Sequence, residues 1–282
     1  MISVQDKIPC VYKTCVFDRK SSKRCDQNYT IIATPERQHY NALINPSEKI
    51  DGTCSYVQVW NEKPWLWARL IKRKSEHENW MKAVNGRENT HIGWVPVLEK
   101  SAYPWHHSTF HAESARGLVL LPVDEQTCEL TTKPLESLLN QTVELIGTKI
   151  NGNPYKLGDL KTPFHVLVPH GAFPVKNLPG ECTFEEMRTW METQHIEGIV
   201  WNGQYKLTRR HLNLKWPLKS TSLMRRSITV HGVTFGPLKD LNGRSFSSLE
   251  DFNKCVTSLN SNHLSAKYEN SCFALEPEPE LN

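Results

Sequence analysis

The residues with the clearest chemical potential are Lys49, Asp51 and Gly52, which form a Lys-x-Asp-Gly motif. A lysine amine can attack an electrophilic phosphorus and hold the product as a phosphoramide. The ordinary pKa of lysine is about 10.4, so such a site must lower it with cations, a metal or desolvation. Gly52 has no Cβ and leaves room for a bound nucleotide. The motif predicts a covalent nucleotidyl-transfer site, although alone it is as typical of a solvated turn before a strand.

Four further side chains follow in an order that suits this chemistry. They are Arg69, Glu144, Glu197 in the segment Glu-Gly-Ile-Val-Trp, and Lys206. Carboxylates in apolar segments are costly to bury unless they are paired or bind a metal, and Lys206 is a candidate partner for Glu197. Together the residues supply a nucleophile, a phosphate clamp and metal-binding carboxylates. Each could instead be a solvated charge on a strand.

Alternating apolar and polar residues predict the strands that position these side chains. Residues 52–71 alternate on both sides of a turn at 61–64, which predicts a hairpin with Lys49 before its first strand and Arg69 on its second. Shorter apolar runs bounded by Gly, Pro or Asn predict buried strands at 117–121, 143–147, 165–168 and 196–201.

Capping boxes predict three helices, because each has a Ser or Thr followed three residues later by Glu. The boxes start at Ser75, Thr183 and Ser247, and Pro134 predicts a fourth, short helix over 135–139. We therefore expect an α+β fold with antiparallel sheets flanked by helices.

Composition restricts the class of protein. The chain has 282 residues, 38% of them hydrophobic, with nine tryptophans and a net charge of +4. This is enough for a sizeable core, and the mild positive charge permits a nucleic-acid partner. We find no signal peptide, no apolar run of membrane-spanning length and no zinc-type cysteine spacing among the eight cysteines. The expected location is cytoplasmic or nuclear, with no membrane partner.

A composition change near Pro217 predicts a boundary. We expect one large domain over residues 1–217, a small extension over 218–272 and a disordered acidic tail over 273–282. The segment after Pro217 is too short for an oligonucleotide-binding barrel, so no OB-fold is expected.

The order Lys-x-Asp-Gly, Arg, Glu, Glu-Gly-Ile-Val and Lys resembles the covalent nucleotidyltransferase superfamily of ATP-dependent ligases and mRNA capping enzymes. More closely, residues 7–217 resemble the ATP-dependent 5′–3′ RNA ligase family of animals. The matching segments are 48–56, 66–70, 144–155, 169–173 and 196–201, and the segment 144–155 is the most specific.

This resemblance implies a nucleotidyltransferase (adenylation) domain and an ATP-dependent RNA ligase. Lys49 would become AMP-modified, with Mg²⁺ as the metal and Mn²⁺ able to substitute. The substrate would be RNA with 5′-phosphate and 3′-hydroxyl ends, in a pathway of RNA repair. No obligate protein partner is evident.

The resemblance also assigns roles to single residues. Glu48 would lie beside the adenine, and Asp51 near the catalytic lysine. Arg69 and Glu144 would contact ribose or phosphate. Glu197 would bind or orient the magnesium, with Glu144 as the second metal-binding candidate.

The remaining roles concern the adenine and the α-phosphate. Val200 would pack on one adenine face and His165 on the other, while Lys206 would hold the α-phosphate as a catalytic residue. The superfamily's last motif usually reads Lys-x-Lys, and this chain has Thr208 at the second position. Arg209 is the candidate for the missing charge.

Two alternatives stay open. Lys-x-Asp-Gly also serves GTP-dependent RNA guanylyltransferases, so nucleotide choice must separate the two enzymes. A catalytically inactive protein that binds RNA ends is the third hypothesis, and the complete set of motifs argues against it.

Overall fold

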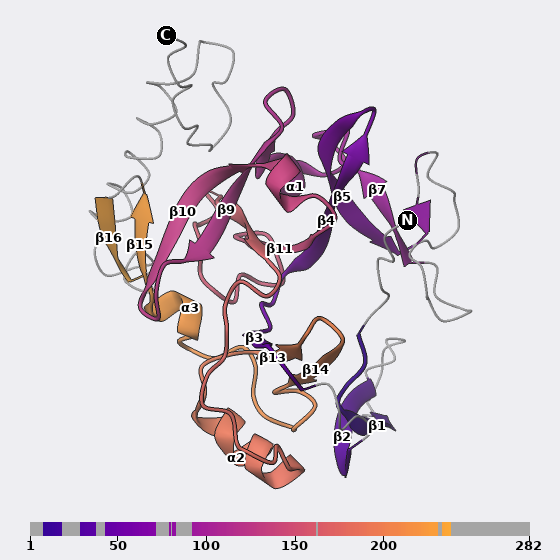
Figure 1. Ribbon diagram of the computed structural model, residues 1–282, viewed down its shortest axis with the longest axis vertical. Coiled ribbons are helices and arrows are strands. Elements are labelled where there is room, and N and C mark those ends of the chain that lie inside the picture. Colours follow the sequence, from indigo (N-terminus) through magenta and orange to yellow (C-terminus); the bar gives the residue numbers. More distant parts are fainter. Residues whose placement is uncertain are drawn as a thin grey trace. The chain divides into compact units, whose positions relative to one another are not determined.

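The computed structural model describes residues 8–18, 29–37, 43–71, 79, 81–82, 92–161, 163–230 and 233–237 (Figure 1). The described residues divide into two compact units. Unit 1 holds those of 51–169 and 223–237, and unit 2 holds those of 8–50 and 170–222. The chain therefore passes from unit 2 to unit 1 between Ile50 and Asp51, inside the Lys-x-Asp-Gly motif.

Unit 1 is built on one long sheet with the strand order β16-β15-β10-β9-β12-β11-β4-β5-β7-β6, and β8 also pairs with β9. Neighbours are antiparallel except β10 with β15 and β12 with β9. The strands are β4 (Thr53–Trp60), β5 (Lys63–Ile71), β6 (Met81–Lys82), β7 (Ile92–Pro96), β8 (Phe110–His111), β9 (Arg116–Pro122), β10 (Thr127–Pro134), β11 (Thr142–Gly147), β12 (His165–Pro169), β15 (Ser227–Val230) and β16 (Val233–Pro237).

The predicted hairpin is present as β4 and β5. Its two-residue loop, Asn61 and Glu62, has positive φ angles of 46° and 67°. Two left-handed residues match the right-handed twist of the flanking strands, and asparagine tolerates this conformation well. The predicted strands at 117–121, 143–147 and 165–168 are also confirmed, as β9, β11 and β12.

The core of unit 1 consists of aliphatic side chains from the middle strands of the sheet. Val57, Leu66, Leu118, Leu145 and Leu167 are fully buried. Each such side chain contributes about 1.5–3 kcal/mol through burial. An aromatic cluster extends this core where β4, β5 and β7 meet; its buried members are Tyr56, Trp67 and Trp94.

The described residues of unit 2 form two small sheets and the helix α2. One sheet has the order β14-β13-β3, and the other pairs β1 with β2. Residues of β1, β13, β14 and α2 share one hydrophobic core, which includes Tyr12, Met187, Met191, Ile199 and Trp201. The elements are β1 (Tyr12–Asp18), β2 (Tyr29–Arg37), β3 (Pro46–Glu48), β13 (Gly198–Trp201), β14 (Tyr205–Thr208) and α2 (Phe184–Thr193).

The capping box at Thr183 begins α2 as predicted. The Thr183 hydroxyl accepts from the Glu186 backbone N–H, and the Glu186 carboxylate accepts from the Thr183 N–H at 3.0 Å. The short helix expected after Pro134 is a 3₁₀ helix, η1 (Leu135–Leu138). The helices predicted from Ser75 and Ser247 lie outside the described residues.

The α+β description needs correction in its helical part. Besides α2 and η1, the described chain has α1 (Pro104–His107) and α3 (Ser222–Arg225), each of four residues. The described residues are therefore mainly sheet, because their apolar positions alternate with the two-residue period of strands. The nucleotidyltransferase fold and the boundaries at 217 and 272 stay predictions. No described helix is long and apolar enough to cross a membrane.

Candidate functional site

The predicted site residues fall on both units. Arg69 lies on β5 of unit 1, half-buried and opposite Trp94, as the predicted hairpin requires. The other predicted residues of unit 1 are Asp51, Glu144 and His165; those of unit 2 are Glu48, Lys49, Glu197, Val200, Lys206 and Arg209.

The three-stranded sheet of unit 2 brings three sequence motifs together. β3 ends at Glu48, directly before Lys49, and β13 begins directly after Glu197. β14 contains Lys206. Because β13 pairs with β3 on one side and β14 on the other, the Lys-x-Asp-Gly, Glu-Gly-Ile-Val and Lys motifs converge on one small sheet.

The register of this sheet separates a core face from a second face. Directly opposed residues project on the same side, and successive residues alternate. Ile199 and Leu207 are opposed and fully buried in the core of unit 2. Val200 is opposed to Ser47 and Lys206. Val200 and Lys206 therefore project from the face opposite to Ile199, and both are half-buried.

Lys49 and Glu197 form an ion pair. The Lys49 Nζ donates to Glu197 Oε2 at 2.7 Å, and the two side chains are 25% and 10% exposed. The Lys49 backbone N–H donates to the Gly198 carbonyl at 2.8 Å. A Cβ on Gly198 would overlap the carbonyl oxygen of Leu207, so only glycine fits there. The sequence suggested Lys206 as the partner of Glu197, and the pairing with Lys49 was not predicted.

Glu48 is buried and its carboxylate is oriented by Ser222. The Ser222 hydroxyl donates to Glu48 Oε1 at 2.5 Å, and the Glu48 N–H donates to the Phe173 carbonyl at 2.7 Å. The position of Glu48 is thus defined by its own unit. Its expected contact with adenine stays a prediction.

His211 is a neighbour of the Lys206 strand that sequence reasoning missed. The Thr208 N–H donates to His211 Nδ1 at 3.2 Å, and the His211 N–H donates to Thr208 Oγ1 at 3.3 Å. Burial, together with the charges of Lys206 and Lys49, lowers the pKa of His211 to about 4. The imidazole is therefore neutral near pH 7, with Nδ1 as acceptor and the proton on Nε2. Its only sequence signal was its spacing from Thr208.

Arg209 has a structural environment. Arg209 is 6% exposed, and its guanidinium donates to the carbonyls of Met191 at 2.6 Å, Gln194 at 3.0 Å and Lys215 at 2.8 Å. Met191 and Gln194 lie at the C-terminal end of α2, where a positive charge is favourable. These bonds to backbone carbonyls hold the Arg209 side chain within unit 2. Its expected role at the phosphate stays a prediction.

In unit 1, Asp51 is held by two residues from the segment 144–155. Asn151 Nδ2 donates to Asp51 Oδ1 at 2.8 Å and to the Gly52 carbonyl at 2.7 Å. The Asp51 N–H donates to the Tyr155 hydroxyl at 2.7 Å. The sequence singled out this segment as family-specific, but it assigned no role to Asn151 or Tyr155.

Glu144 lies in the middle of β11 and is buried, with Cys54 and Val168 opposite it on the neighbouring strands. Gly52 packs against the same strand. A Cβ on Gly52 would lie 2.8 Å from Glu144 Cγ and would overlap the carbonyl oxygen of Leu145. Glycine is therefore needed at position 52 because the chain packs closely against β11 there. The sequence explained Gly52 by room for a nucleotide and did not predict this contact.

His165 is buried and stacks on Trp105, with ring centroids 4.9 Å apart and an interplanar angle of 26°. Its Nε2 accepts from the Lys149 N–H at 3.2 Å, and its Nδ1 lies 3.4 Å from Ser108 Oγ. Burial lowers the pKa of His165 to about 4, with a further contribution from Lys149. The ring is neutral near pH 7. Its stacking on adenine stays a prediction, and Trp105 covers one ring face.

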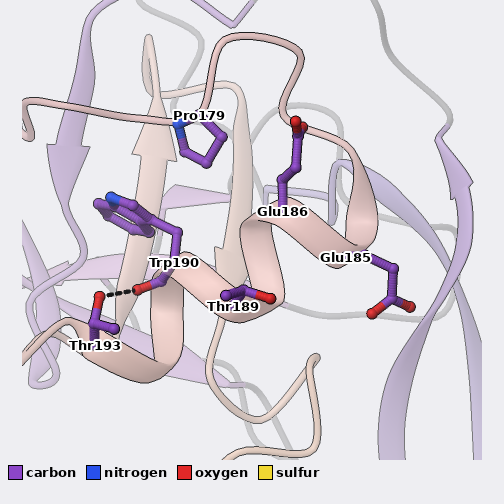
Figure 2. Close-up of a pocket in the computed structure, with 6 residues that line it drawn as sticks. All are labelled: Pro179, Glu185, Glu186, Thr189, Trp190 and Thr193. Carbon is purple, nitrogen blue, oxygen red and sulfur yellow. Dashed lines mark hydrogen bonds between the residues drawn. The ribbon is translucent and has the colours of Figure 1, made fainter.

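A shallow groove lies beside α2 in unit 2 (Figure 2). Thr193 Oγ1 donates to the Trp190 carbonyl at 2.7 Å at one end of it. None of the predicted site residues lines the groove, so we assign it no role. Its lining residues are Pro179, Glu185, Glu186, Thr189, Trp190 and Thr193.

Comparison with known proteins identifies the family. A family model described as RNA ligase 1 matches residues 1–85 and 76–265. The chain belongs to the RNA ligase 1 family. It is 36% identical to RNA ligase 1 of Danio rerio over 88% of this chain and 97% of the relative. It is 37% identical to RNA ligase 1 of Pongo abelii over 81% of this chain and 87% of the relative. RNA ligase 1 of Mus musculus is 38% identical over 81% of this chain and 86% of its own length.

Membership in the RNA ligase 1 family confirms the resemblance predicted from the motifs. The match also reaches residue 265, beyond the 7–217 region that the sequence motifs marked. Residues 218–265 are therefore part of the match to the RNA ligase 1 family.

Proposed function

We propose that this protein is an ATP-dependent RNA ligase that works through a lysine–AMP intermediate. The observation that carries the proposal is the 2.7 Å contact between Lys49 Nζ and Glu197 Oε2. It joins the nucleophile motif to the carboxylate motif, within a chain whose relatives are named RNA ligases.

The proposed reaction has three steps. First, the Lys49 amine, after losing its proton, attacks the α-phosphorus of ATP; a P–N bond forms, a P–O bond breaks and pyrophosphate leaves. Second, an oxygen of the RNA 5′-phosphate attacks the same phosphorus; the P–N bond breaks and AMP stays on the RNA end. Third, the RNA 3′-hydroxyl attacks the 5′-phosphate, its proton is released, and AMP leaves.

The ion pair suits a lysine that is unreactive before the first step. The contact with Glu197 stabilises the ammonium form of Lys49, which cannot attack. Its proton must leave and the pair must separate before the P–N bond forms. Lys206, on the face of the sheet opposite to the core, is the proposed ligand of the α-phosphate, with Val200 beside it against adenine.

Magnesium is the metal that this chemistry implies, and Glu197 fits it. Carboxylate oxygens are the ligands that Mg²⁺ prefers, and the Glu197 side chain is 10% exposed, which suits a site from which most water is excluded. When bound, Mg²⁺ would neutralise charge on the phosphates. Glu144 is the second proposed carboxylate. Glu48 is proposed beside the adenine.

For unit 1 we propose the roles that the resemblance implies. Asp51 acts near the lysine, Arg69 contacts ribose or phosphate, and His165 covers adenine. RNA binding through basic side chains should weaken steeply with rising salt.

Sealing of a 5′-phosphorylated RNA with either ATP or GTP tests the proposal. We expect joined product with ATP and magnesium, and none with GTP. A covalent GMP adduct would favour a guanylyltransferase, whereas a folded protein that retains RNA but seals nothing would favour an end-binding protein.

A further inference from the structure

Asn151 and Tyr155 hold the two residues that follow the nucleophile segment. The amide of Asn151 donates to the Asp51 carboxylate at 2.8 Å and to the Gly52 carbonyl at 2.7 Å. The hydroxyl of Tyr155, a fully buried residue, accepts from the Asp51 N–H at 2.7 Å. Three hydrogen bonds thus fix both the backbone and the side chain of the Asp-Gly pair.

The loop that presents Asn151 is itself fixed by side-chain bonds. Thr148 Oγ1 donates to the Leu157 carbonyl at 2.6 Å and accepts from the Phe164 N–H at 2.9 Å. Asn153 exchanges two bonds with Leu157, at 3.0 and 2.8 Å. Asn151 has a φ of 47°, a left-handed conformation that asparagine tolerates better than most residues. The amide of Asn151 is therefore held in a defined place and direction.

We propose that Asn151 is a positioning residue for the attack by Lys49, an inference that rests on the proposed function. Only Ile50 separates Lys49 from Asp51, so two peptide units of about 3.8 Å each join their Cα atoms, and a shift at Asp51 displaces the backbone next to the lysine. On the other side, the Lys49 N–H is fixed by the Gly198 carbonyl at 2.8 Å. The Lys49 N–H is thus bound to backbone of unit 2, and Asp51 is bound by side chains of unit 1.

The chemistry of the asparagine side chain supports this role over a purely structural one. An amide orients the Asp51 carboxylate and leaves its negative charge in place, whereas lysine or arginine would neutralise it. If Asn151 served only to attach its loop to the chain at Gly52, its bond to the Gly52 carbonyl would be sufficient. The second bond goes to the side chain that the family resemblance places near the catalytic lysine.

The test compares two steps of the proposed reaction in Asn151→Ala, Asn151→Asp and wild-type protein. Single-turnover formation of the Lys49–AMP adduct should slow by about 10–100-fold in Asn151→Ala, since a misplacement of about 1 Å costs on that order. Asn151→Asp keeps the shape, lacks the donor and repels Asp51, so it should slow at least as much. Sealing of RNA supplied with a pre-adenylated 5′ end needs no attack by Lys49, and should stay within about threefold of wild type.

Asn177→Ala is the matched control, because Asn177 is exposed and also has a left-handed φ, of 56°. It should leave both steps unchanged. Equal slowing of both steps in Asn151→Ala, or adduct formation at the wild-type rate, would overturn the inference while leaving the proposed function intact. A wild-type protein that forms no adduct would overturn the proposed function and this inference with it.

Discussion

Lys49 and Glu197 are 148 positions apart in the sequence, and their side chains meet at 2.7 Å. The contact depends on the pairing of β3 with β13, which places the ends of these strands side by side. The first step of the proposed reaction needs this pair to separate, since an ammonium group cannot attack phosphorus.

Removal of the Glu197 carboxylate should separate catalysis from folding. We expect Glu197→Ala to keep the fold and to slow formation of the Lys49 adduct by roughly 100-fold at limiting magnesium. Glu192→Ala is the control, because Glu192 is exposed and forms a 3.7 Å surface pair with Arg188. Adduct formation measured across a magnesium titration checks this. Near-normal rates for Glu197→Ala at limiting magnesium would contradict the metal role.

Gly52→Ala should damage unit 1 through packing. The added methyl group would overlap the Leu145 carbonyl and crowd the Glu144 side chain. We expect a loss of about 1–3 kcal/mol in the free energy of unfolding, with slower adduct formation. Gly180→Ala is the control, since no atom lies within 4 Å of its Cβ position. If Gly52→Ala were as stable as Gly180→Ala in urea unfolding, β11 would be able to move aside for the methyl group, and the prediction would be wrong.

Arg209→Ala should destabilise unit 2. It would remove one donor each from the Met191, Gln194 and Lys215 carbonyls, at a cost of about 2–4 kcal/mol. The neighbouring Arg210 is exposed, so Arg210→Ala should change stability by less than about 0.5 kcal/mol. Urea unfolding of both variants measures the difference. Equal stabilities would contradict the structural role of Arg209.

His211 should make unit 2 less stable in mild acid. Its folded pKa of about 4 lies below the ordinary value of 6.5, so the unfolded chain binds the proton more readily between these values. The stability that neutral His211 gives to the folded state is nearly complete above pH 6.5 and is lost as the pH falls toward 4. At pH 5 the loss in the free energy of unfolding is about 2 kcal/mol. Protonation of Nδ1 also breaks its bond from the Thr208 N–H.

The check on His211 is a comparison with His211→Gln at several pH values. The stability advantage of wild type over the variant should shrink by about 2 kcal/mol between pH 7 and pH 5. Other titrating groups, including His165 with its own lowered pKa, affect wild type and the variant equally, so their effects cancel in the difference. An advantage that does not change with pH would contradict the prediction.

Local patterns predicted the local structure well. The β4–β5 hairpin follows from alternation around Asn61, and α2 from the capping box at Thr183, because both signals act within a few residues. Two predicted helices, from Ser75 and Ser247, lie outside the described residues, so the helical share of the fold could not be judged from them.

Long-range partners were not readable from the sequence. The sequence suggested Lys206 as the partner of Glu197, whereas the pairing of β3 with β13 brings the Lys49 amine to 2.7 Å from the Glu197 carboxylate. Arg209 and Arg210 are adjacent and chemically identical, yet one is 6% exposed and the other lies in solvent. Similarly, Asn151 gave no sign of binding Asp51, since that contact depends on the shape of an entire loop.

The most direct test of the central claim is to trap the adduct and follow its AMP. The protein is incubated with magnesium and α-labelled ATP, freed of nucleotide, and digested so that mass spectrometry locates the AMP. A second portion then receives 5′-phosphorylated RNA without ATP. We predict one AMP on Lys49, none in Lys49→Ala, and transfer of the label to the RNA 5′ end. An adduct on another residue, or an undiminished adduct in Lys49→Ala, would contradict the account.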